Sequence, residues 1–355
     1  MPAHAFHRPP TSGDRSSSSR RLMTAAGGCA AALAVFLTAC QNPFVPDSQR
    51  EGQAEPGIGT VGGPGQEHIE AGEAALDAGN NAAAMEEFAK AIAVNPTLTD
   101  AHMGMGDIYR TEGDFAKAEK SYGEAARLAP KNFDAQYYHG LMLHLLDRVT
   151  DAVSAYLQAL SVKPEDFQTN LNLSVAYYQL GETNQAHTFG ERAVKIDPRN
   201  GPARVNLAAV YADLGRHQEA VTEFQQSFEL VESTPRILLA YAESLRALGR
   251  YGEMRGTLDQ LVKKVPSAAA WERLGYAQFK LGDYAGASSS FDSSLKIDPD
   301  YFPALNGVAV CELNTYVWSN GANNDARQRA LAALRRSLVI NRNQPSIEAL
   351  LGRYK

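Results

Sequence analysis

A proline that returns at nearly constant intervals is the feature that most constrains this chain of 355 residues. The series is Pro96, Pro130, Pro164, Pro198, Pro266 and Pro299. The first three intervals are 34 residues, the next is 68 with Glu232 at its vacant midpoint, and the last is 33. A fixed period of this size predicts stacked structural repeats, each packing on its neighbours. If each proline is placed at position 32, seven units begin at Gly65, Thr99, Phe133, Phe167, Gly201, Pro235 and Ala268.

Small residues recur at fixed places in each unit and predict a pair of helices. Position 8 is always Gly, Ala or Ser, and position 20 is Ala in six of the seven units. Position 15 is Gly in six units, which suits the left-handed conformation that closes a first helix. The proline prevents continuation of a second helix. The small residues let the two helices approach closely, and an aromatic residue at position 24 of most units fills the space beyond them.

This pattern resembles that of the tetratricopeptide repeat (TPR) family. The residues that carry the resemblance are the small residue at 8, an aromatic at 11 in three units, Ala at 20, the aromatic at 24, a small residue at 27 and Pro at 32. It covers residues 65–313, with units one to seven in 65–300. The resemblance implies an all-α fold, a right-handed superhelical α-solenoid of about eight helix-turn-helix units.

Two parts of the chain depart from the pattern. Unit six has Met254, Leu258 and Leu261 where small and aromatic residues are expected, so we predict looser packing and a bend there. Residues 301–355 hold a degenerate repeat, in which a polar stretch is inserted at 314–325 and helices are expected at 327–340 and 346–353. We expect this part to cap the solenoid with a more polar outer face.

Residues 1–39 have the layout of an export signal. Ser19-Arg20-Arg21 precedes Leu22–Ala39, a run without charge. The run ends in Leu37-Thr38-Ala39-Cys40, which resembles the lipobox of bacterial lipoproteins. The resemblance implies a lipoprotein signal peptide that is cleaved before Cys40, a diacylglycerol thioether on the sulfur of this residue and a further N-linked chain such as palmitate.

Three alternatives stay open for this leader: a chance cysteine, a retained membrane anchor and a twin-Arg signal built on Arg20-Arg21. The apolar run is marginal for an anchor because glycines dilute it. By family analogy, Gln41 after the cysteine favours the outer membrane. We therefore predict a lipid-anchored protein of a bacterial cell envelope, on the outer membrane and facing the periplasm.

The next segment, residues 40–64, is expected to comprise the lipidated cysteine and a flexible tether. Between residues 41 and 65, ten of twenty-five residues are Gly or Pro, a composition that buries no core. A random coil of this length spans about 25–30 Å. The body is then expected to hang near the lipid bilayer without lying on it.

The charge balance argues against nucleic acid as a partner. The whole chain has a net charge of −6, and without residues 1–39 it retains 30 basic and 39 acidic residues, a net charge of −9. Nucleic-acid binding instead rewards clustered Lys and Arg. Protein partners are therefore expected.

Reaction machinery is not evident. The sequence has no Gly-x-x-x-x-Gly-Lys-Ser/Thr, no Gly-x-Ser-x-Gly and no His-Glu-x-x-His. His139 and His144 are five residues apart, on different faces of a helix, and so are poor metal partners. Cys311 is expected to be a small buried hydrophobe rather than a nucleophile. We expect no catalysis, no metal and no cofactor.

A peptide-binding groove is the better prediction. In TPR proteins the residues at positions 2, 5, 6, 9, 12 and 13 face the concave side. Position 6 is Asn172 in one unit and Asn206 in the next. An amide can pair with a peptide backbone whatever the side chains, and the pair resembles a short piece of the asparagine ladder of some TPR proteins. The alternative is that both amides are merely solvated.

Other side chains are expected around this pair in the groove. They are Tyr137, Tyr138, Tyr178, Gln179, Arg236, Glu243, Arg246, Arg273 and Phe279. Aromatics beside amides suit an extended apolar segment, although packing is the alternative for several of the tyrosines. The family's clamp for a terminal carboxylate is absent from the central units. Trp318, expected in the inserted loop, is either an exposed anchor or tucked against the last unit.

These features together predict a non-catalytic scaffold. It would be a membrane-anchored TPR lipoprotein that holds an extended peptide or partner subunit in its groove, for the assembly of an envelope, pilus or secretion complex. The alternative is a non-catalytic subunit of an envelope enzyme complex, such as a glycosyltransferase or hydrolase. A chain that is itself an enzyme would need a catalytic constellation not found in the sequence.

Overall fold

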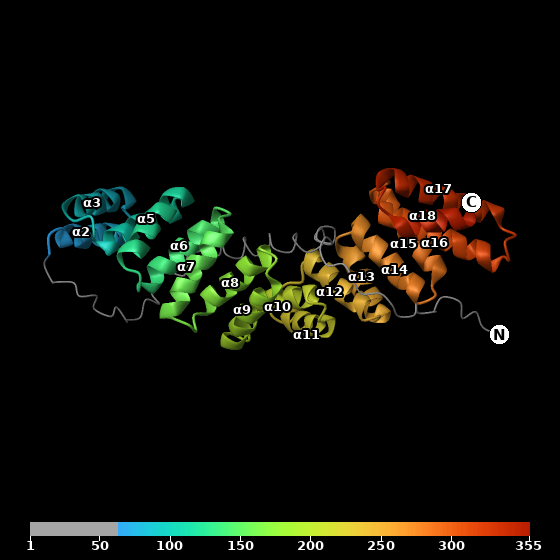
Figure 1. Ribbon diagram of the computed structural model, residues 1–355, viewed down its shortest axis with the longest axis horizontal. Coiled ribbons are helices and arrows are strands. Elements are labelled where there is room, and N and C mark those ends of the chain that lie inside the picture. Colours follow the sequence, from blue (N-terminus) through green and yellow to red (C-terminus); the bar gives the residue numbers. More distant parts are fainter. Residues whose placement is uncertain (1–62) are drawn as a thin grey trace, which may run out of the picture.

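The computed structural model describes residues 63–355, and within this range the chain is helical throughout, without strands. Helix pairs follow one another along a single long axis (Figure 1). The first pair lies at one end of the molecule and the last pair, with the C-terminus, at the other. The all-α solenoid prediction is confirmed. The predicted leader, Cys40 and the tether up to residue 62 lie outside the described residues.

Eight helix pairs and one final helix make up the solenoid. The first helices are α2 (Gln66–Asp77), α4 (Thr99–Thr111), α6 (Phe133–Leu145), α8 (Phe167–Gln179), α10 (Gly201–Asp213), α12 (Pro235–Ala247), α14 (Ala268–Lys280) and α16 (Phe302–Trp318). The second helices are α3 (Asn81–Val94), α5 (Phe115–Leu128), α7 (Val149–Val162), α9 (Thr183–Ile196), α11 (His217–Ser227), α13 (Tyr251–Lys264), α15 (Tyr284–Ile297) and α17 (Asn324–Ile340). The final helix is α18 (Pro345–Tyr354). Between residues 63 and 355, none of these helices combines the length and the apolar character needed to cross a bilayer.

The turn inside each regular pair uses a left-handed residue. The six glycines at position 15 have φ between 70° and 83°, as the sequence predicts. In the third unit Asp147 takes the same place with φ 61°. Side chains cap many of the helices: Asn132 accepts from the Ala135 amide at 3.0 Å, and Asp166 accepts from the Thr169 amide at 2.7 Å.

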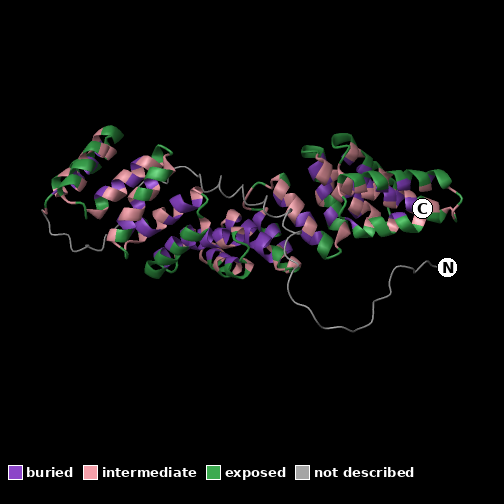
Figure 2. Ribbon diagram, turned by 45° about the horizontal axis from the view of Figure 1, so that its top comes forward, coloured by how far each residue is buried: buried purple, intermediate pink, exposed green. Residues whose placement is uncertain are grey.

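In units one, two, three and seven, the core holds an aromatic ring packed against a glycine. A Cβ on Gly106 would lie 2.7 Å from the ring of Tyr122, and one on Gly140 would lie 2.7 Å from Tyr156. Both tyrosines are fully buried. The small residue at position 8 therefore makes room for the aromatic at position 24 of the same unit. Buried residues run along the centre of the stack from end to end (Figure 2).

In unit six the larger side chains are buried, but α12 and α13 approach each other over a smaller part of their length than the helices of any other described pair, which agrees with the predicted looser packing. Met254 and Leu258 are 0% exposed and Leu261 is 2% exposed, because these larger aliphatic side chains fill the space that a ring and small residues fill elsewhere. Another irregularity lies earlier, at the missing proline. Helix α11 has 11 residues, whereas each of the other second helices in units one to seven has 14, and residues 228–234 form the link to α12.

The last unit also differs from expectation. Residues 314–318, predicted as inserted loop, continue α16, and α17 begins at Asn324. The left-handed residues that end the first helix, Asn320 (φ 50°) and Gly321 (φ 82°), lie later in this unit than position 15, where the regular units have theirs. Trp318 is thus the last residue of α16. Its side chain is 71% exposed, as predicted for an exposed anchor. Its ring also packs edge-on against Tyr284 with ring centroids 5.6 Å apart, so it is partly tucked against the solenoid as well.

Candidate functional site

Asn206 is committed to contacts inside the solenoid. Its Nδ2 donates to Ser174 Oγ at 2.7 Å, and that hydroxyl donates to the Ala186 carbonyl at 2.7 Å. The chain of bonds ties α10 to α8 and α8 to α9, and Asn206 is 1% exposed. This contradicts the prediction that its amide is open to a peptide backbone, because a small hydroxyl in the preceding unit already uses it.

Asn172 lies between two polar neighbours. Its Nδ2 is 3.5 Å from the hydroxyl of Tyr137 on α6, and its Oδ1 accepts from Gln168 Nε2 at 3.3 Å. It is also 1% exposed. The two asparagines therefore do not act as equivalent rungs, and a peptide-binding role for Asn172 stays a prediction.

The tyrosines of α6 and α8 pack against one another and their neighbours. Tyr138 lies 5.3 Å from Tyr122 in a stacked arrangement and 5.2 Å from Tyr137 edge-on, measured between ring centroids. The guanidinium carbon of Arg110 lies 5.2 Å from the centroid of Tyr138. Tyr178 is 8% exposed. The packing alternative therefore holds for Tyr138 and Tyr178, whose rings help to join neighbouring units.

Gln179 joins α8 to α6 through a histidine. His144 Nε2 and Gln179 Oε1 are 2.9 Å apart, and since the amide oxygen accepts, this ring nitrogen is assigned the proton. Burial lowers the pKa of His144 below its ordinary value. The contact and the lowered pKa favour a neutral imidazole packed between α6 and α8.

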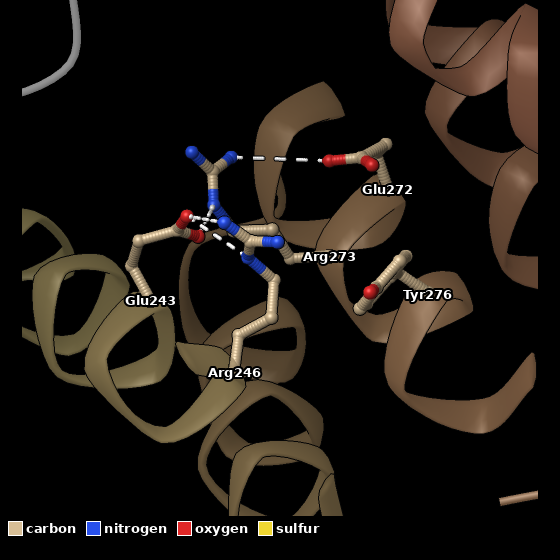
Figure 3. Close-up of a pocket in the computed structure, with 5 residues that line it drawn as sticks. All are labelled: Glu243, Arg246, Glu272, Arg273 and Tyr276. Carbon is tan, nitrogen blue, oxygen red and sulfur yellow. Dashed lines mark hydrogen bonds and ion pairs between the residues drawn. The ribbon is translucent and has the colours of Figure 1, made fainter. Parts of the chain in front are cut away.

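Three predicted groove residues do come together between α12 and α14 (Figure 3). Arg246 Nε donates to Glu243 Oε1 at 2.9 Å, and a terminal nitrogen of Arg246 contacts the same oxygen. Arg273 Nε lies 3.8 Å from Glu243 Oε2. Two guanidinium groups from successive units thus converge on one carboxylate, at the wall of a shallow pocket.

Two further residues complete this pocket, and the sequence analysis missed both. Tyr276 lies beside Arg246, whose guanidinium carbon is 5.7 Å from the ring centroid, and Glu272 Oε2 lies 4.0 Å from a terminal nitrogen of Arg273. They occupy positions 9 and 5 of unit seven, which face the concave side in the TPR family. The position numbers alone could therefore have found them. We call these five residues the α12–α14 cluster: Glu243, Arg246, Glu272, Arg273 and Tyr276.

One nitrogen of Arg273 lacks a hydrogen bond within residues 63–355, although the side chain contacts Glu243 and Glu272. Its Nε is buried and makes no hydrogen bond with the described residues, and a terminal nitrogen donates to the Ala269 carbonyl at 3.4 Å. A buried donor without an acceptor is costly, so it marks a place where an added acceptor would bind. Burial raises the pKa of Glu272, which weakens the negative charge beside Arg273 near the acid end of the pH range.

The remaining predicted groove residues lie outside the α12–α14 cluster. Arg236 is half-buried in the first turn of α12. Phe279 packs edge-on against Tyr284 with ring centroids 5.1 Å apart, in the core beside α15. It is a packing residue because the ring completes the apolar contact between two helices of unit seven.

Between residues 63 and 355, no three His, Cys, Asp or Glu side chains are grouped to hold a metal ion. Burial raises the pKa of the Cys311 thiol to about 12, so it stays protonated at neutral pH and is a poor nucleophile. The α12–α14 cluster is accordingly suited to binding by charge and hydrogen bonds.

Sequence comparison now decides the family. The model of the tetratricopeptide repeat matches five stretches that together span most of the solenoid: residues 69–132, 103–166, 146–201, 171–236 and 239–302. The chain belongs to the tetratricopeptide repeat family. A search of curated proteins finds no significant match.

Solved TPR structures resemble this chain in fold. A TPR protein from Parabacteroides merdae is 20% identical, with a TM-score of 0.48, and the match covers 72% of this chain and 98% of that one. YrrB, described as a TPR protein with an unusual peptide-binding site, is 17% identical with a TM-score of 0.46, covering 57% of this chain and 99% of that one. PilF of Pseudomonas aeruginosa is 20% identical with a TM-score of 0.46, covering 57% and 92%. At these identities the likeness concerns the fold alone.

Proposed function

We propose that this TPR protein is a non-catalytic adaptor that holds an extended peptide or partner subunit along the face formed by its first helices. The α12–α14 cluster is the part of that face which engages the partner. The observation that carries this proposal is the buried Arg273 Nε without a hydrogen-bond acceptor among the described residues. The Arg273 side chain is 29% exposed, so a backbone carbonyl or a carboxylate of the partner would reach its guanidinium group, and a small rotation of that group would bring Nε to the acceptor.

The surroundings of Arg273 support a polar anchor beside an aromatic contact. Arg246 is held in place by Glu243, so less rotamer entropy is lost when a ligand reaches it. The Tyr276 ring offers a flat apolar contact next to that charge. Arginine and tyrosine are enriched among the residues that dominate protein interfaces.

Site-specific crosslinking tests the location of the partner. A photo-reactive residue at Tyr276 should capture one recurrent partner in the native cell, whereas the same residue at Gln226, exposed on the second helix α11, should not. Arg273→Ala should reduce the capture, and Arg273→Lys should restore it in part because a lysine keeps the charge without the fork geometry. Equal capture at Tyr276 and Gln226 would exclude the α12–α14 cluster as the binding site.

We further propose that the adaptor is a lipoprotein anchored through Cys40 and works in the assembly of an envelope, pilus or secretion complex. Support comes from the leader, the lipobox-like Leu37-Thr38-Ala39-Cys40 and the Gly- and Pro-rich tether ahead of a TPR body. Two acyl chains hold a protein on a membrane far longer than one. The tether then leaves the solenoid free to meet partners beside the bilayer.

Cys40→Ser tests the anchor. We expect an uncleaved precursor without lipid label, because the hydroxyl of serine does not accept the diacylglycerol group that the thiol accepts. Metabolic labelling with a radioactive fatty acid and the mass of the mature chain measure both effects. Normal processing and membrane retention of Cys40→Ser would contradict the anchor.

A further inference from the structure

The two ends of the solenoid carry net charges of opposite sign, although the charge does not change evenly between them, since residues 268–300 hold 5 acidic and 3 basic side chains, a net charge of −2. Residues 66–128, the first two units, contain 12 acidic and 5 basic side chains, a net charge of −7. The next two units, residues 133–196, have a net charge of −3 with 7 acidic and 4 basic side chains, and residues 201–264 are balanced with 8 of each. Residues 302–355 contain 3 acidic and 7 basic side chains, a net charge of +4. The molecule is therefore acidic at its N-terminal end and basic at its C-terminal end.

The acidic end presents a helix with one side open. Among the described residues, α2 packs on α3 and α4 but has no preceding unit on its other side. Glu67, Glu70 and Asp77 are exposed on α2, and they make no ion pair with any residue from 63 to 355. An interior first helix of a solenoid would have a neighbouring unit at this place.

The basic end carries cations that the chain itself does not neutralise. Arg329 and Arg336 on α17 pair with Glu312 and Asp300, each at 2.8 Å. In contrast, Arg335, Arg342 and Arg353 are exposed, and no carboxylate of the described part of the chain lies within ion-pair distance of them.

An apolar side chain accompanies these cations. Val339 is 78% exposed and lies four residues after Arg335, so the two share one face of α17. Charge and exposed apolar surface on the same helix are features of an interface more than of a solvated cap.

The two ends cannot meet within one molecule. They lie at opposite extremes of the long axis, with α2 at one limit and α17 and α18 at the other (Figure 1). We propose that copies of this chain associate head to tail, the basic C-terminal end of one copy (Arg335, Arg342, Arg353 and Val339) docking on the acidic α2 of the next (Glu67 and Glu70). The partner is a second copy of this chain, because the charges of the two free ends are complementary.

Head-to-tail contact has a defined consequence for assembly. The contact joins two different surfaces, so it leaves a free end on each pair and allows longer chains to form. The charged groups are exposed, so the association weakens as salt screens them. It uses the ends of the solenoid and leaves the α12–α14 cluster open, so its test is independent of the proposed adaptor function.

The test is the mass of the full-length chain in solution at two salt concentrations. The screening length falls from about 30 Å at about 0.01 M salt to about 3 Å at about 1 M salt. We expect a mass that rises with protein concentration at low salt, measured by sedimentation, and a monomer at high salt. A monomer at both salt concentrations, or an assembly that persists unchanged at high salt, overturns the proposal.

Charge reversal assigns the two surfaces. Arg335→Glu with Arg342→Glu places acidic side chains at the docking positions of both ends, and Glu67→Lys with Glu70→Lys places basic side chains there. Each variant alone should associate at least about tenfold more weakly, whereas an equimolar mixture should recover association because its unlike ends are again complementary. The mixture also keeps the proposal testable if one reversal slightly destabilises the fold.

A matched control separates end-to-end docking from net charge. Glu229→Lys with Glu232→Lys changes exposed residues in the middle of the solenoid by the same charge, and it should leave association intact. Equal loss of association in this control overturns the proposal. Binding of the wild-type chain to anionic lipid vesicles through Arg335 and Arg342, without self-association, would also overturn it in favour of a lipid surface.

Discussion

At the scale of single residues, the turn inside each unit shows how local stereochemistry sets the repeat. Six of the seven position-15 residues are glycines with φ of 70° to 83°, where a side chain would be strained. Asp147 adopts φ 61° with its Cβ in place, which an aspartate tolerates better than most residues. The third unit is therefore the one regular unit in which the turn residue is not optimal.

Asp147→Gly should stabilise the protein. The substitution relieves the left-handed strain, which is about 1–2 kcal/mol for a residue with a Cβ, although the added flexibility of the unfolded chain offsets part of the gain. We expect the free energy of unfolding to rise by up to about 1 kcal/mol, measured by urea denaturation. Gly181→Asp, the converse change in the next unit, should lower the free energy of unfolding. If the turn were not strained, the two substitutions would not change this free energy in opposite directions.

Glu272 makes stability depend on pH in the opposite sense to a paired carboxylate. Burial raises its pKa above 4.5, so between 4.5 and the raised value the folded state binds more protons than the unfolded state. Stability contributed by this group is present below pH 4.5 and is lost as the pH rises through that window. Glu272→Gln should remove this part of the loss. Thermal midpoints of both proteins across pH 4 to 8 measure it, and parallel curves would contradict it.

At the scale of helices, the close contact between a glycine and a ring determines how the two helices pack in units one, two, three and seven. In unit three the ring of Tyr156 on α7 is seated against Gly140 on α6. The missing Cβ lets the helices approach, and the fully buried ring fills the remaining space. The contact couples the choice of residue at position 8 to that at position 24.

Gly140→Ala should therefore destabilise the protein although alanine is the better helix former. The new Cβ would stand 2.7 Å from the Tyr156 ring, and overpacking of this kind costs about 1–3 kcal/mol. Gly256→Ala on α13 is the matched control, since a Cβ there meets nothing within 4 Å and should gain about 1 kcal/mol of helix propensity. Urea denaturation measures both, and a stable Gly140→Ala variant would show that the helices can shift apart.

At the scale of the whole molecule, each unit is stabilised by packing on its neighbours, and a cap covers the outer side of the last unit. Helix α18 lies on the end of the stack, where Leu351 packs into the cluster of Leu313 and Leu331. Arg327 Nε donates to the Tyr354 carbonyl at 2.8 Å, so the chain end is tied back to α17. The cap covers apolar surface that a further repeat would otherwise cover.

Deletion of residues 345–355 should loosen the C-terminal end alone. Because each unit contacts its neighbours and little else, the amide hydrogens of α16 and α17 should exchange faster while those of α2 to α9 keep their protection. Hydrogen exchange followed by mass spectrometry resolves the two regions. Uniformly faster exchange along the chain would mean that the solenoid unfolds as a single cooperative unit.

The candidate site was harder to predict than the fold. The sequence pointed to Glu243, Arg246 and Arg273, which do lie together in the structure. It also pointed to Asn206, whose amide donates a hydrogen bond to Ser174. Position numbers tell which side of a helix a residue occupies. They do not tell whether the neighbouring unit supplies a partner that already uses its polar atoms.

The sequence alone determined the helix pairs, their number and their order, because helix periodicity, left-handed glycines and proline stops act over a few residues. The tertiary structure decided which polar groups remain available. Asn206 finds its partner 32 residues away, and Arg273 meets a carboxylate from the preceding unit. The tertiary structure likewise decided that α16 extends to Trp318. These outcomes depend on how packed helices are rotated and which rotamers their neighbours allow, and that information is spread over several units rather than written in any one of them.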